Sequence, residues 1–125
     1  MHTAAPMHLY DTSRGEVTAF APGETVTLYV CGITPYDATH LGHAATYVTY
    51  DVLQRRLIDR GHRVRYVRNI TDVDDDIIRA ARQRDVHYLD LAFGETVRFD
   101  DDMAALNTLP PWSEPRATGA IGNIR

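Results

Sequence analysis

Between residues 25 and 68 the hydrophobic pattern changes from that of a strand to that of a helix and back, which constrains the fold most strongly. Residues 25–30 (TVTLYV) are β-branched and aromatic and predict a buried strand. Residues 41–60 predict a helix, because their apolar side chains recur at positions 41, 44, 45, 48, 52 and 53. Gly61 is expected to end that helix, and residues 62–68 (HRVRYVR) alternate as a second strand. This order predicts a parallel βαβ unit of an α/β fold.

The segments on either side predict smaller elements. Residues 8–20 suit a hairpin around the turn that ends at Gly15. After the βαβ unit we expect a helix over residues 73–84, capped by Thr71 or Asp72, and a second helix over residues 88–106. Residues 112–118 are expected to form an extended loop, followed by a short helix that reaches Arg125. A chain that stops inside a helix is expected to be a fragment or a truncated form.

The composition narrows the class of protein. The chain has 125 residues, 44% hydrophobic and 24% charged, which suits one globular domain. It has no apolar run near the roughly 18 residues of a membrane span and no secretory leader, so we expect a cytoplasmic protein without a membrane partner. Its one cysteine agrees with a reducing compartment. The net charge of −4 argues against a general nucleic-acid surface, and all 13 basic residues are arginine, so the chain supplies no lysine to a phosphate.

His40 and His43 stand where the strand and turn lead into the long helix. A helix N-terminus has free N–H groups and a positive dipole end, which favour an anion such as phosphate. Gly42 allows a ligand to approach the backbone closely. We therefore expect both imidazoles to donate hydrogen bonds to phosphate oxygens during nucleotidyl transfer. The alternative is that they are surface or capping residues; a metal site of the H-x-x-H type is a weaker interpretation.

Cys31 ends the first strand of the unit. It is a candidate for a small buried residue, for a nucleophile assisted by a histidine, or for one ligand of a zinc ion whose other ligands this chain does not supply. The acidic residues at 72–76 are better explained by a helix N-terminus than by a calcium loop, because Ile77 and Gln83 replace the required glycine and glutamate. The chain also lacks the glycine-rich fingerprints of P-loop kinases and dinucleotide dehydrogenases.

Two motifs in this order carry a resemblance to a known family. The string YVCGITPYDATHLGH at residues 29–43 resembles the HIGH region of class I aminoacyl-tRNA synthetases. The string YVRNITDVDD at residues 66–75 resembles the second block of the cysteinyl branch, which contains cysteinyl-tRNA synthetases and the cysteine ligases of mycothiol biosynthesis. The likeness extends from about Leu9 to Ile124. It implies part of a Rossmann-like nucleotide-binding fold, with residues 1–125 as the N-terminal part of the catalytic domain.

The resemblance also implies roles for single residues. Cys31 would be one ligand of a zinc ion that receives the thiolate of the substrate L-cysteine. His40 and His43 would stabilise the phosphates of ATP as the cysteine carboxylate attacks. Cys31 and Gly42 are also expected to contact the bound ligand. Seven further positions would line the cysteinyl adenylate: Gly32, Ile33, Thr34, Thr46, Asn69, Ile70 and Thr71.

The resemblance leaves the acceptor open. Residues 35–39 (PYDAT) and 44–47 (AATY) look like the mycothiol ligases, whereas residues 76–78 (DII) and 113–118 (SEPRAT) look more like the tRNA enzymes. We favour ATP-dependent ligation of cysteine to an amine sugar; the alternatives are a cysteinyl-tRNA synthetase fragment, a non-catalytic binding module and a decayed remnant. The family's other zinc ligands and its lysine loop would lie beyond this chain, so activity is expected to need a complementing C-terminal half. Self-association through an exposed sheet edge is a further expectation.

Overall fold

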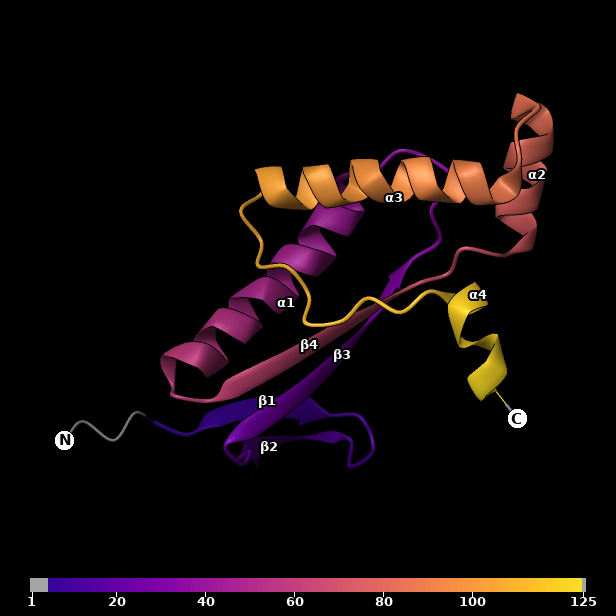
Figure 1. Cartoon of the computed structure of the whole chain (residues 1–125). Coiled ribbons are helices and arrows are strands. Elements are labelled where there is room, and N and C mark those ends of the chain that lie inside the picture. The colour runs from indigo at the N-terminus through magenta and orange to yellow at the C-terminus, as the bar shows by residue number, and fades with distance from the viewer. Residues whose placement is uncertain (1–4, 125) are drawn as a thin grey trace.

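The computed structural model describes residues 5–124 and contains the predicted βαβ unit (Figure 1). Strands β3 (Thr25–Ile33) and β4 (Arg63–Ile70) pair in parallel, with Thr25 opposite Arg63 and Ile33 opposite Ile70. Helix α1 (Leu41–Asp59) connects them, and Gly61 follows it with a φ of 88°. The mixed α/β fold class and the helix-stopping role of Gly61 are thus confirmed.

The N-terminal hairpin is also confirmed. Strands β1 (Met7–Asp11) and β2 (Glu16–Phe20) pair antiparallel. The Asp11 carboxylate accepts hydrogen bonds from the backbone and the hydroxyl of Ser13, at 2.9 and 2.7 Å. Gly15 takes a φ of 70°, a conformation that favours glycine, and so closes the turn.

Helix α2 (Asp75–Arg84) begins later than the sequence predicts. Its N-cap is Asp74, whose carboxylate accepts from the Asp76 N–H at 2.6 Å, so the expected cap at Thr71 or Asp72 was wrong. Asp72 is buried, with 1% of its surface exposed, and its carboxylate has another partner. It accepts from both the backbone N–H and the hydroxyl of Thr118, at 2.9 and 2.6 Å, and so holds the C-terminal segment.

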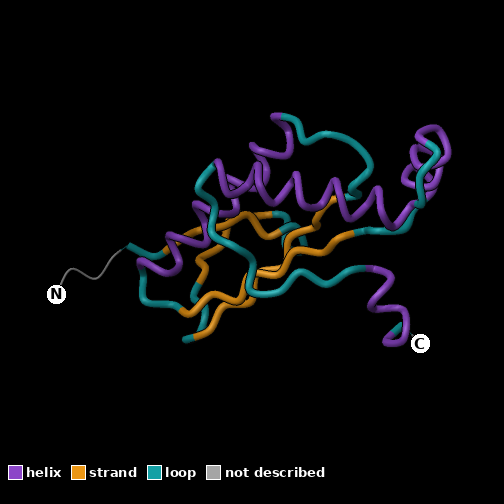
Figure 2. The backbone as a smooth tube through the Cα atoms, turned by 45° about the horizontal axis from the view of Figure 1, so that its top comes forward, coloured by secondary structure: helices purple, strands orange, loops and turns teal. Residues whose placement is uncertain are grey.

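Helices α1 and α3 (Tyr88–Ala105) lie on the same side of the β3–β4 pair (Figures 1 and 2). Between these layers lies a core of seven buried residues: Val30, Ile33, Tyr47, Tyr66, Ile70, Phe99 and Met103. Their apolar contact fixes both helices on the sheet. None of the helices within residues 5–124 is long and apolar enough to span a membrane.

The segment after α3 runs beside β4, as Figure 2 shows. Ser113 bridges Val67 and Arg116 bridges Ile70, both in parallel, and the Ile70 N–H donates to the Pro115 carbonyl at 2.9 Å. The predicted extended loop is therefore a partial third strand. It ends where α4 (Ala117–Ala120) begins, and a 3-10 turn, η1 (Ile121–Asn123), follows; Arg125 lies outside the described residues.

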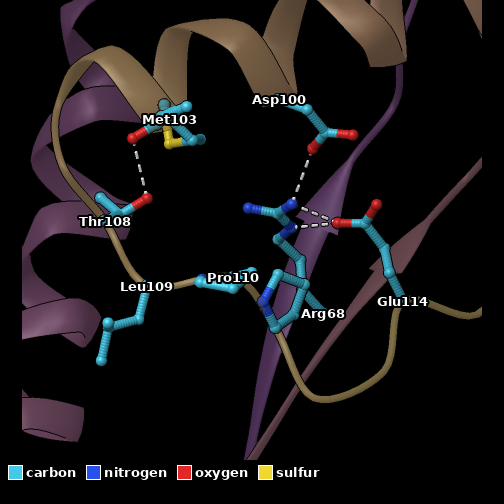
Figure 3. Close-up of a pocket in the computed structure, with 9 residues that line it drawn as sticks. Arg68, Asp100, Met103, Thr108, Leu109, Pro110 and Glu114 are labelled. Carbon is cyan, nitrogen blue, oxygen red and sulfur yellow. Dashed lines mark hydrogen bonds and ion pairs between the residues drawn. The ribbon is translucent and has the colours of Figure 1, made fainter.

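Arg68 connects β4 to α3 and to the C-terminal segment, beside a cavity of about 450 Å³ (Figure 3). Its side chain is 5% exposed and pairs with Asp100 at 3.0 Å and with Glu114. Burial raises the pKa of the Glu114 carboxyl, and the adjacent guanidinium opposes that shift. The guanidinium also stacks over Phe99, 4.6 Å from the ring centroid.

We expect Arg68→Ala to lower the free energy of unfolding by about 3 kcal/mol, because it leaves a partly buried carboxylate unpaired. Arg65→Ala is the matched control: Arg65 lies on the same strand, is exposed and contacts Trp112 by a cation–π interaction at 5.1 Å, so its loss should stay below about 1 kcal/mol. Urea unfolding of both variants measures the difference. Equal losses would show that the buried ion pairs of Arg68 stabilise the fold no more than an exposed arginine does.

Candidate functional site

The two predicted histidines cap helix α1 reciprocally. His40 is the N-cap residue, and its Nδ1 accepts from the Gly42 N–H at 3.1 Å. The His43 Nδ1 in turn accepts from the His40 N–H at 3.2 Å. The two ring centroids are 4.0 Å apart. The capping alternative is thus realised, and it brings both imidazoles together at the helix N-terminus.

This capping changes which groups can bind an anion. The N–H groups of His40, Gly42 and His43 all have partners, since the His43 N–H donates to the His40 carbonyl at 2.9 Å. These three of the expected free backbone donors are therefore taken up, whereas no partner of the Leu41 N–H lies among the described residues. Because each Nδ1 accepts from a backbone N–H, the proton of each neutral ring is assigned to Nε2. The turn therefore offers two imidazole N–H groups as donors, beside the backbone N–H of Leu41.

Gly42 is fitted closely to the His40 ring. A Cβ at this position would lie 2.8 Å from Cε1 and 3.0 Å from Nδ1 of His40, so a larger residue would displace the ring. The Gly42 carbonyl accepts from the hydroxyl of Thr46 at 3.0 Å. Thr46 is exposed one turn along the helix, and this contact turns its hydroxyl to the backbone.

Cys31 lies at an irregularity at the end of β3, where the register with β4 shifts between Val30 and Ile33. Its side chain is exposed, so the interpretation as a buried small residue was wrong. The next residue must be glycine, because a Cβ on Gly32 would lie 1.5 Å from the Asn69 carbonyl oxygen. The close approach of the two strand ends therefore determines how Cys31 is presented.

Asn69 forms the polar connection between the strand ends. Its Oδ1 accepts from the Gly32 N–H at 2.8 Å and from the Tyr29 hydroxyl at 3.0 Å. Its Nδ2 donates to the Thr71 hydroxyl at 3.3 Å. Because the amide is committed to this network, it holds the backbone of the site together rather than reaching freely into solvent.

The other predicted contacts divide into two groups. Ile33 and Ile70 are 7% and 0% exposed and belong to the core; the Ile33 carbonyl accepts from the Thr71 N–H, and the Ile70 N–H donates to Pro115, each at 2.9 Å. Thr34 lies next to the turn and lines a hollow of about 20 Å³ together with His43. The strand end and the histidine pair therefore meet, and ligand contacts by these residues stay predictions.

The residues that the structure describes do not form a zinc site. Within residues 5–124 no group of three histidine, cysteine, aspartate or glutamate side chains could hold a metal ion. Cys31 alone supplies one thiol where a zinc site needs about four ligands. The described residues therefore supply one ligand of such a site.

Comparison with known proteins shows the family of this chain. Residues 18–125 match the family model described as tRNA synthetases class I (C) catalytic domain. The chain belongs to this family. It is 52% identical over 118 residues to the L-cysteine:1D-myo-inositol 2-amino-2-deoxy-alpha-D-glucopyranoside ligase of Mycobacterium ulcerans, covering 94% of the chain and 29% of that ligase. It is 50% identical over 119 residues to the ligase of the same name from Corynebacterium kroppenstedtii, covering 95% and 23%.

Two solved structures share the fold. The Mycobacterium tuberculosis methionyl-tRNA synthetase, in complex with methionyl-adenylate, matches 66% of this chain and 16% of its own with a TM-score of 0.59 and 28% identity. The LeuRS of Agrobacterium radiobacter K84 matches 76% of this chain and 12% of its own with a TM-score of 0.63 and 23% identity. The Rossmann-like fold class is confirmed, and the chain spans less than a third of the ligases it resembles.

The glycine at the strand end gives a direct test of the packing. We expect Gly32→Ala to lower the free energy of unfolding by about 3 kcal/mol or more, because its Cβ overlaps the Asn69 carbonyl. Gly94→Ala is the control, since a Cβ there meets nothing within 4 Å inside helix α3 and should stabilise by about 0.5–1 kcal/mol. Thermal or urea unfolding separates the two. A tolerated alanine at position 32 would contradict the close approach.

The capped histidine predicts a pH dependence. Burial, and then the neighbouring His40, lower the pKa of His43 below its ordinary value of 6.5. Between the folded and the unfolded pKa of His43, the unfolded chain binds more protons than the folded chain. The contribution of a neutral His43 to the free energy of unfolding is therefore fully present above about pH 6.5 and is lost as the pH falls below that value. Unfolding of the wild type and of His43→Gln at pH 7.5 and 5.5 measures this. The wild type should lose more stability than the variant; parallel losses would contradict the prediction.

Proposed function

We propose that this chain is the N-terminal part of the catalytic domain of an ATP-dependent cysteine ligase, and that the start of helix α1 binds the ATP phosphates. The observation that carries the proposal is the reciprocal cap, which leaves the Nε2–H groups of His40 and His43 as neighbouring donors. Family membership and the names of the most similar ligases support the same chemistry.

The activation step is a nucleotidyl transfer. The carboxylate of L-cysteine attacks the α-phosphorus of ATP, the bond to the bridging oxygen breaks, and pyrophosphate leaves as cysteinyl adenylate forms. Negative charge grows on the phosphate oxygens, and two fixed imidazole N–H donors stabilise it without reorganisation. The N-terminal dipole of the 19-residue helix α1 adds to this field. The exposed Gly42 leaves room beside the rings for the nucleotide.

Cysteine selection would use Cys31. Cys31 would be one of the residues that hold a zinc ion, together with ligands from elsewhere, and the metal would supply a soft Lewis acid that prefers the thiol of cysteine to the hydroxyl of serine. The network around Gly32, Asn69 and Thr71 would border the adenylate. The chain contains no lysine, so any lysine that contacts phosphate would come from elsewhere.

The acceptor follows from the relatives. The ligases at 50–52% identity carry an inositol amino sugar in their names, which favours an amine sugar as acceptor. A tRNA acceptor is the second candidate, because the matching family model is named for tRNA synthetases. Completion by a C-terminal half, or by self-association, would supply the remaining groups. A reaction that consumes ATP and needs a free thiol fits the cytoplasm.

Calorimetric titration of the 125-residue chain with ATP tests the phosphate site. The double variant His40→Ser, His43→Ala keeps a side-chain acceptor at the N-cap position and removes both imidazole Nε2–H donors. We expect it to bind ATP at least tenfold more weakly than the wild type, because hydrogen bonds to charged groups contribute about 1.5 kcal/mol or more each.

His87→Asn is the matched control. His87 caps helix α3 in the same way, accepting from the Leu89 N–H at 3.2 Å, but lies at another helix start. Its replacement should leave ATP binding unchanged. Unaltered binding in the double variant, or an equal loss in His87→Asn, would contradict the proposed role of the pair.

A further inference from the structure

The peptide group between Cys31 and Gly32 is held at both of its polar atoms by side chains. The Cys31 carbonyl accepts from the Tyr47 hydroxyl at 3.1 Å, and the Gly32 N–H donates to Asn69 Oδ1 at 2.8 Å. This peptide lies where the register between β3 and β4 shifts, so the regular ladder does not orient it. Two side chains from different elements replace the ladder there.

The Tyr47 side of this contact is rigid. Tyr47 is 5% exposed, and its ring packs edge-on against the ring of Phe99, with the two centroids 5.2 Å apart. Burial raises the pKa of its hydroxyl to about 12, so the group keeps its proton and remains a donor at neutral pH. The packed ring thus holds its hydroxyl in place to donate a hydrogen bond to the Cys31 carbonyl oxygen.

The Asn69 side is equally constrained. The amide accepts from Gly32 and Tyr29 and donates to Thr71, which leaves it little freedom to turn. Gly32 also lies too close to the Asn69 backbone for any side chain. The Cys31–Gly32 peptide is therefore hydrogen-bonded by Tyr47 of α1 at its carbonyl and by Asn69 of β4 at its N–H.

Tyr47 lies four residues after His43 on helix α1. A residue four positions along a helix lies on the same face, so one rigid helix carries the histidine pair and also holds the backbone of Cys31. The contact therefore joins the helix that carries the imidazoles to the strand residue that carries the thiol. Sequence reasoning overlooked Tyr47, whose only local signal is an aromatic residue on the face of the helix that carries His43.

We propose that Tyr47 is a positioning residue whose hydroxyl, acting with Asn69, fixes the Cys31–Gly32 peptide and thereby the place of the Cys31 thiol relative to the histidine pair. The role deepens the proposed function and rests on it: in a cysteine ligase the thiol must stand at a set distance from the phosphate site. Tyr47 touches neither reactant in this arrangement.

The test compares two tyrosines that differ in this contact. Tyr47→Phe removes the hydroxyl and keeps the ring packing. Tyr66→Phe is the control, because Tyr66 is also 5% exposed and its hydroxyl has no hydrogen-bond partner among the described residues. Both variants lose a buried hydroxyl and keep the ring, and only Tyr47→Phe also loses a hydrogen bond to the Cys31 carbonyl.

Two local readouts report on the peptide. Cys31 is the only cysteine of the chain, so its reaction rate with 5,5′-dithiobis(2-nitrobenzoic acid) follows this thiol alone. Hydrogen exchange of the Gly32 amide, followed by NMR, reports on its bond to Asn69. In Tyr47→Phe we expect both rates to rise roughly fivefold, the usual effect of one lost hydrogen bond, while Tyr66→Phe leaves them within twofold.

The outcomes separate this inference from the proposed function. Equal rates in the two variants, at equal stability, overturn the positioning role. ATP binding by the wild type without any Tyr47-specific change supports the function and overturns the role of Tyr47. A Tyr47-specific change in a chain that does not bind ATP supports the hold on the peptide and overturns the proposed function.

Discussion

The close approach of Gly32 to the backbone of Asn69 is the constraint on which the site depends. No side chain fits at position 32, so the carboxyl ends of the two parallel strands come into direct contact there. The regular pairing is interrupted there, and Cys31 is exposed at the end of β3. A site at the carboxyl ends of parallel strands is common in α/β folds. Here its shape follows from one missing Cβ.

The histidine pair illustrates how capping and binding can be one arrangement. A helix start usually offers its own N–H groups to an anion. In α1 the N–H groups of His40, Gly42 and His43 are satisfied within the turn, and each imidazole that accepts one of them has its tautomer fixed. The donor capacity of the helix start is transferred from the backbone to Nε2 atoms that reach further out. Low-pH protonation of Nδ1 would remove the cap as well as the tautomer.

Long-range polar contacts hold the outer elements around this centre. Arg68 connects the sheet to α3 and to the C-terminal segment, and Asp72 holds that segment again through Thr118. Asp51 accepts from the Leu109 N–H at 2.8 Å and attaches the loop after α3 to α1. Each of these buried groups is hydrogen-bonded, as low polarity around them requires. Together they add a partial third strand to a two-stranded parallel pair.

The sequence by itself determined the βαβ unit, the hairpin, the three long helices to within two residues at either end, and the place of His40 and His43 at the start of α1. These depend on periodicity, glycine and capping residues, whose effects extend over about one helical turn. Only the tertiary structure decided that Asp72 binds Thr118 instead of capping α2, that residues 112–116 join the sheet, and that Tyr47 holds the Cys31 carbonyl. Those contacts join residues 16 to 46 positions apart, and packing of the whole core, which no local pattern records, brings them together.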